Sequence, residues 1–99
     1  MSDRLAPVHP GEVLREEFLA PLSVSAAALA SAMDLAAAEL EPVLAGVAPV
    51  TAELALRLNR ALGPDARFWL NLQAQYDLAC VEDAIGDRLS AVRRLEPAE

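Results

Sequence analysis

Two short stretches of helical periodicity, separated by about three residues, lie between Ser25 and Thr51 and constrain the fold more than any other feature. The apolar residues that recur at helical spacing are Leu29, Ala30 and Met33 in the first stretch and Leu40, Val43 and Leu44 in the second. Gly46 follows the second stretch, where a left-handed residue commonly ends a helix. Two helices joined by so short a connection predict a helix-turn-helix motif, whose second helix normally enters the DNA major groove.

Composition extends the helical prediction to the whole chain. Its 99 residues suffice for one domain with one modest core. Hydrophobic residues make up 55%, chiefly Ala and Leu, and alternating β-branched runs are missing, so we expect an all-α fold. No apolar run approaches the roughly 20 residues of a membrane span, and no signal-peptide pattern opens the chain. A cytoplasmic location is therefore expected.

The sequence offers few residues for catalysis or metal binding. Cys80 is the only cysteine and His9 the only histidine, which removes most combinations of nucleophile, base and metal ligand. The adjacent Glu16 and Glu17 point about 100° apart on a helix and cannot act as a paired acid and base. We therefore predict no enzyme activity, no catalytic residue, no metal site and no cofactor.

The charge balance is strongly acidic. The net charge is −7, from eight Arg, no Lys and fifteen acidic residues. Proteins dedicated to DNA binding usually carry a basic patch, because affinity comes largely from neutralising phosphates. An acidic surface suits a basic protein partner, or serves solubility alone. Composition leaves these alternatives open.

Capping residues and helix breakers predict five helices. His9 is expected to cap the first, with Pro10 at its first position, and Pro21 to end it. Ser25, Thr51 and Asp65 are expected to cap the second, fourth and fifth helices. Gly86 is expected to interrupt the fifth helix, whose length is open beyond about Asp83, before a last helical piece. The predicted ranges are 10–20, 26–33, 36–45, 52–62 and 66–83, followed by 88–95; the buried stripe expected on the fourth helix is Leu54, Leu58, Ala61 and Leu62.

Three separated motifs resemble one known family. They are HPGEVLREEFLAPL near the start, VTAELALRLNRALG in the middle, and FWLNLQAQYDL, which carries a Trp-Leu-Asn-Leu-Gln block. Together they are similar to HigA-type antitoxins, the short relatives of the Cro/CI repressor-like helix-turn-helix proteins, over about residues 9 to 78. The family motif residues here are His9, Pro10, Gly11, Glu12, Trp69, Asn71, Gln73, Tyr76 and Asp77.

The resemblance implies a fold and partners. The fold would be a five-helix, lambda-repressor-like helix-turn-helix domain over residues 1–83, with a short helical extension over residues 84–99. The partners would be a second copy in a homodimer and a basic ribonuclease toxin of the RelE-like (HigB-like) class. Such an antitoxin neutralises its toxin by direct contact and represses its own operon.

The chain departs from the family pattern where DNA would be read. The second helix of the motif, which enters the DNA major groove, is here called the reading helix. The family typically has Gly-Val-Ser before this helix, and this chain has Asp34-Leu35-Ala36. A basic pair that usually follows the helix is replaced by Val47 and Ala48. The positions that the resemblance turns toward DNA are Ala36, Ala37, Ala38, Glu39, Glu41, Pro42, Val47 and Ala48. Alanine makes no hydrogen bond to a base edge, and glutamate repels phosphate, so DNA binding is predicted to be weak or lost.

Two hypotheses about function remain after this comparison. One is an antitoxin and transcriptional regulator that still binds operator DNA, though weakly. The alternative is a protein-interaction module of the same fold that has lost operator recognition. Pro42, which costs a helix interior about 3 kcal/mol, favours the second.

The fifth helix carries apolar residues with two possible uses. Trp69, Leu72, Tyr76 and Cys80 recur on one side of it and are expected to complete the core. The alternative is that the far end of the helix pairs with a twofold mate. The possible dimer contacts are Leu78, Cys80, Val81 and Ile85.

Overall fold

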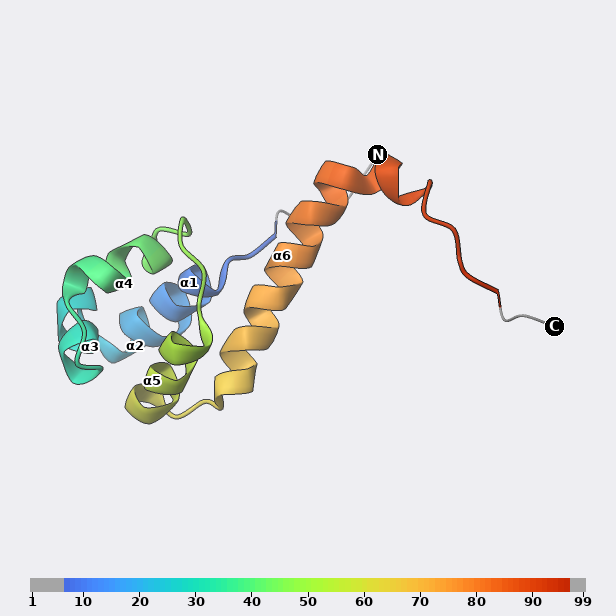
Figure 1. The fold of residues 1–99 in the computed structure, drawn as a ribbon. Helices are drawn as coiled ribbons and strands as arrows, with labels where there is room; N and C mark the ends of the chain where they lie inside the picture. The colour runs from blue at the N-terminus through green and yellow to red at the C-terminus, as the bar shows by residue number, and fades with distance from the viewer. Residues whose placement is uncertain (1–6, 97–99) are drawn as a thin grey trace.

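The structure, a computed structural model, describes residues 7–96, and in that range the chain forms five helical segments (Figure 1). The first joins α1 (Pro10–Val13), a wide π-helical turn η1 (Leu14–Leu19) and α2 (Ala20–Leu22) without a break. The others are α3 (Ala26–Ala32), α4 (Ala37–Leu44), α5 (Ala52–Leu62) and α6 (Ala66–Leu89). The predicted all-α, five-helix fold is confirmed. No helix in this range is long and apolar enough to cross a membrane.

The predicted caps account for most helix starts. The Nδ1 atom of His9 accepts a hydrogen bond from the Gly11 N–H at 2.8 Å, and Pro10 is the first helical residue. Ser25 accepts from Ala28 N–H at 3.0 Å and Thr51 from Leu54 N–H at 3.2 Å. Each side-chain acceptor satisfies an N–H that the first turn of a helix leaves without a partner.

The end of the first helical segment differs from the prediction. Pro21 lies inside α2, and the helix ends at Leu22, after which Ser23 adopts a left-handed conformation with φ 56°. The turn before Pro21 is π-helical, with the Ala20 N–H donating to the Arg15 carbonyl five residues earlier. A proline in a helix lacks an N–H donor, and its ring clashes with the carbonyl four residues earlier. A turn that widens just before the proline gives the ring room, so the helix can continue past it.

The C-terminal prediction was wrong in two respects. Gly86 does not interrupt α6, because a single interior glycine costs a helix only about 1 kcal/mol relative to alanine. The last helical piece over residues 88–95 does not form: α6 ends at Leu89, a turn follows, and residues 92–96 have no regular structure. The predicted boundary at residue 84 falls within α6 and stays a prediction.

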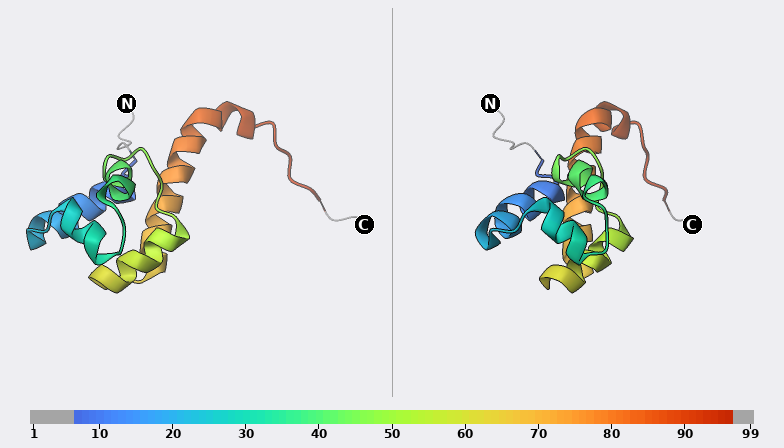
Figure 2. Two further views of the ribbon diagram at one scale, coloured as in Figure 1. Left: turned by 60° about the vertical axis from the view of Figure 1, so that its left-hand side comes forward. Right: turned by 90° about the vertical axis from the view of Figure 1, so that its left-hand side faces the viewer.

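The core lies where α1 and η1, together with α3, α4 and α5, meet the first half of α6. Trp69 is fully buried, with its ring centroid 5.1 Å from Phe18 and 4.9 Å from Phe68. On α5 the buried stripe contains Leu54, Ala55 and Leu58, while Ala61, predicted to be buried, is exposed. Figures 1 and 2 show the second half of α6 projecting away from the other helices.

Candidate nucleic-acid interface

The helix pair α3 and α4 forms the predicted helix-turn-helix. All six apolar residues that predicted it are buried. Asp34 makes the turn in a left-handed conformation with φ 59°, and the Leu35 N–H closes it on the Ala30 carbonyl at 2.8 Å. Aspartate tolerates this conformation better than most residues, which explains how it occupies the place of the family's glycine.

The outward side of α4 carries acidic and small side chains. Leu40, Val43 and Leu44 face the core, whereas Ala38, Glu39 and Glu41 are exposed. Ala37 and Pro42 are half-buried, and Ala36 stands just before the helix, so α4 begins one residue later than predicted. In the following loop Val47 is exposed and Ala48 half-buried.

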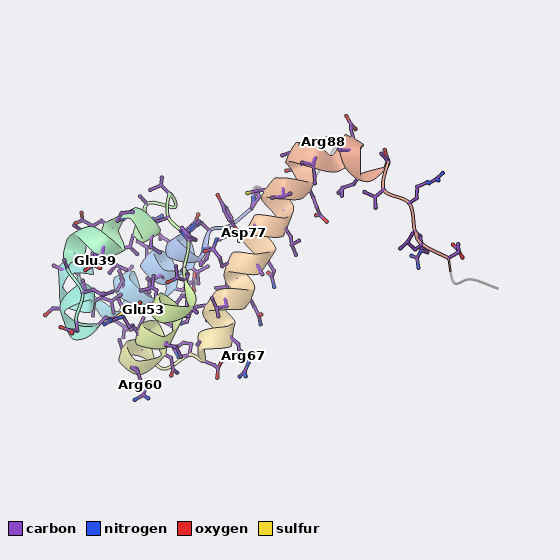
Figure 3. All side chains as sticks on the ribbon, viewed as in Figure 1. Glu39, Glu53, Arg60, Arg67, Asp77 and Arg88 are labelled. Atoms are coloured by element: carbon purple, nitrogen blue, oxygen red, sulfur yellow. The ribbon has the colours of Figure 1, made fainter. Side chains whose placement is uncertain are left out.

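The exposed carboxylate of Glu39 also caps the start of α4. Its Oε2 accepts the Ala36 N–H at 3.0 Å. Ala36 itself has no side chain that could cap α4, so Glu39 provides half of a capping box whose serine is missing. The carboxylate therefore lies at the N-terminal turn of α4, where a reading helix approaches DNA. Figure 3 shows it at the end of the molecule opposite Arg88.

Two arginines near this surface cap the C-terminal ends of the helix-turn-helix. Arg57 of α5 donates from Nη1 to the Met33 carbonyl at the end of α3, and its other donors bond Glu53. Arg15 donates from Nη1 to the Leu44 carbonyl at the end of α4, at 2.6 Å. A cation there satisfies an orphan carbonyl and complements the helix dipole. Sequence reasoning did not find either contact.

The first family motif holds α4 against α1. Gly11 is buried, and a Cβ placed on it would overlap the Val43 carbonyl of α4. His9 is buried beside Gly46, and its ring meets that of Tyr76 edge-on, with centroids 4.8 Å apart. Glycine is therefore required at residue 11 for the close approach of the two backbones. Glu12 of the same motif is exposed.

The last motif fastens the loop after α4 to α6. The buried Gln73 accepts the Val50 N–H on Oε1 at 2.7 Å and donates from Nε2 to Asp77 at 2.9 Å. A hydrogen bond with Cys80 and the charge of the Cys80 thiolate, followed by burial and the Asp77 carboxylate, raise the pKa of Tyr76. Asn71 is exposed. These motif residues thus position the helix-turn-helix and do not reach its outer face.

The possible dimer contacts divide between two faces of α6. Cys80 lies on the same side of α6 as Trp69 and Tyr76, and this side faces the domain. Leu78 and Val81 point the other way and are 62% and 51% exposed. The structure therefore does not bring Cys80 together with the other three predicted contacts. No group of three potential metal ligands occurs in residues 7–96.

The fold and this surface define a helix-turn-helix protein. No protein-family model matches the chain. Virulence-associated protein I of Dichelobacter nodosus is 42% identical to it over 80 residues, which are 81% of this chain and 74% of that protein. Antitoxin HigA-1 of Vibrio cholerae is 40% identical over 72 residues, 73% of this chain and 68% of that protein.

Solved structures support the same assignment. Antitoxin GraA in complex with its operator is 41% identical and superposes with a TM-score of 0.87, covering 98% of this chain and 99% of that one. The chain belongs to the HigA-type family of helix-turn-helix antitoxins and regulators, whose matching members are not enzymes. The resemblance noted in the sequence is confirmed.

Proposed function

We propose that this chain is an antitoxin that forms a homodimer, neutralises a basic RelE-like toxin by direct contact, and binds its operator weakly. The acidic outer face of α4 carries the proposal. Within α4 the only charged residues are Glu39 and Glu41, and both are exposed. A reading helix with two carboxylates and no cation loses the phosphate attraction that supplies most non-specific affinity.

The arginines closest to the helix-turn-helix do not compensate for these carboxylates. Arg15 and Arg57 each hold a helix carbonyl, so turning toward a phosphate would break a bond inside the domain. Alanines at the helix start can touch thymine methyl groups but supply no hydrogen bond to a base. Weak contacts to phosphates through backbone N–H groups would remain.

The toxin half of the proposal draws on charge and kinship. Antitoxin HigA-1 is 40% identical to this chain in sequence, and the structure of antitoxin GraA superposes on it with a TM-score of 0.88. The net charge of −7 favours association with a basic protein, and such attraction speeds encounter as well as strengthening binding.

Fluorescence anisotropy tests the DNA half. The purified chain is titrated into a labelled duplex from upstream of its own gene, at low and moderate salt, beside the variant Glu41→Arg. We expect weak, strongly salt-dependent binding by the natural chain and tighter binding by the variant. Nanomolar affinity of the natural chain at physiological salt would refute weak operator binding. No binding at low salt would favour the protein-interaction module without operator recognition.

Co-expression tests the toxin half. A tagged product of the neighbouring toxin gene is expressed with and without this chain, and its RNA cleavage is measured. We expect a complex that co-purifies and no cleavage. Unchanged cleavage in the presence of excess chain would refute neutralisation, whatever the DNA result.

A further inference from the structure

A pocket of about 300 Å³ lies between α4, the loop that follows it and the first two turns of α5. Four of the side chains that line it are apolar and are buried or half-buried, namely Leu35, Val43, Ala48 and Leu54. This volume is at the lower end of the range for small-molecule sites. The pocket therefore suits one long side chain of a partner better than a whole cofactor.

Two carboxylates and one guanidinium also line this pocket. Arg57 uses each of its three side-chain nitrogens inside the domain: Nη1 on the Met33 carbonyl, and Nε and Nη2 on Glu53 at 3.1 and 3.0 Å. The charges of Arg57 and Glu53 therefore neutralise each other. Glu39 spends only Oε2 on the Ala36 N–H, and its other oxygen has no hydrogen bond or ion pair within residues 7–96. One net negative charge remains at the pocket, and Glu39 carries it.

An apolar pocket beside one unpaired carboxylate matches the side chain of a lysine or an arginine. The aliphatic stem of such a side chain packs against carbon atoms, and its cationic head pairs with the carboxylate. A phosphate group has the wrong charge for this site. Within the described chain Arg57 is the one cation that lines the pocket, and it is already bonded to Glu53. The cation must therefore come from another molecule.

We propose that this pocket receives a lysine or arginine side chain of the basic toxin. This inference rests on the toxin neutralisation of the proposed function and names the surface of this chain that makes the contact. Glu39 pairs with the incoming cation through its free oxygen, while its Oε2 continues to cap α4. Figure 3 shows Glu39 and Glu53 on the part of the molecule that lies away from the second half of α6. The bound toxin then covers part of the face that a reading helix turns toward DNA.

Isothermal titration calorimetry of the full chain with the purified product of the neighbouring toxin gene tests the charge at this pocket. Glu39→Gln removes the charge but keeps an oxygen that accepts the Ala36 N–H, as glutamine does in capping boxes. Glu41→Gln is the matched control, because it is the same exchange at an exposed residue of α4 that does not line the pocket. We expect Glu39→Gln to weaken toxin binding about tenfold, because it removes a charge-assisted hydrogen bond, and Glu41→Gln to leave it nearly unchanged.

A second pair of variants tests the apolar part of the pocket. Ala48→Phe fills the pocket without changing any charge and should weaken toxin binding at least as much as Glu39→Gln. Ala45→Phe adds the same bulk at an exposed residue outside the pocket and should leave toxin binding nearly unchanged. Circular dichroism first establishes that each variant is folded. If Ala48→Phe does not fold, the two glutamine exchanges decide the inference alone.

Other outcomes overturn the inference. Toxin binding that Glu39→Gln and Ala48→Phe leave unchanged would place the toxin on another surface, with neutralisation still standing. Equal losses from Glu39→Gln and Glu41→Gln would show general attraction between charges and no pocket. If Ala48→Phe keeps toxin binding but abolishes duplex binding in the anisotropy assay, the pocket belongs to a DNA contact. A natural chain that binds no toxin would refute direct neutralisation as well, and the co-expression assay detects that case independently.

Discussion

Replacing Gly11 by alanine should be among the most damaging single changes in this domain. The new Cβ would overlap the Val43 carbonyl oxygen and stand 2.8 Å from its carbon, where an ordinary contact is 3.4 Å or more. Both partners are backbone, so no rotamer change relieves the overlap, and α1 must withdraw from α4. Overpacking of this kind costs about 3 kcal/mol. For a domain of this size that corresponds to a fall in Tm of about 12–24 °C.

Thermal unfolding followed by circular dichroism measures this effect, with all proteins at one concentration. Gly86→Ala is the matched control, since a Cβ there meets nothing within 4 Å and the residue lies inside α6. We expect the control to raise helicity and to stabilise the helix by about 0.5–1 kcal/mol. A Gly11→Ala variant that melts within about 2 °C of the natural chain would show that the close packing of α1 on α4 is not required.

Two further substitutions test the scaffold around the helix-turn-helix, each by chemical denaturation. Gln73→Ala leaves the buried Val50 N–H without its acceptor and should lower the free energy of unfolding by about 1–3 kcal/mol. Gln75→Ala, on the exposed side of α6, is the control and should leave this free energy almost unchanged. Equal effects would contradict a stabilising role for the bond between Gln73 and the loop. Pro42→Ala restores a backbone N–H inside α4 and should stabilise the domain by about 1–3 kcal/mol; a loss of stability would show that the proline ring itself is needed there.

Local sequence signals predicted the helices well because caps act over a few residues. His9, Ser25, Thr51 and Asp65 all cap the helices they were expected to cap. A single helix-breaking residue does not determine where a helix ends. Gly86 was expected to break a helix, but the hydrogen bonds on both sides outweigh its cost of about 1 kcal/mol.

Contacts between distant segments account for what the sequence did not predict at the candidate site. Arg15 and the carbonyl of Leu44 are 29 positions apart, and Arg57 and the carbonyl of Met33 are 24 apart. Every residue has a backbone carbonyl, so the sequence does not show which one an arginine side chain will bond. The acidic character of α4 was predicted because it depends only on which residues the helix carries.

The two glutamates of α4 make different contributions, and this difference is testable. Glu39 both repels phosphate and caps the Ala36 N–H, whereas the side chain of Glu41 is exposed and forms no hydrogen bond or ion pair within residues 7–96. Glu39→Ala should therefore lower the free energy of unfolding by about 0.5–1 kcal/mol, and Glu41→Ala should leave it nearly unchanged. Urea denaturation measures both values, and anisotropy measures DNA binding by the same proteins. If both variants lose stability equally, Glu39 does not act as the cap. If they differ as expected, residue 41 can be made basic without lowering the free energy of unfolding. The carboxylate of residue 39 is instead required for stability, because the capping serine of the family is absent.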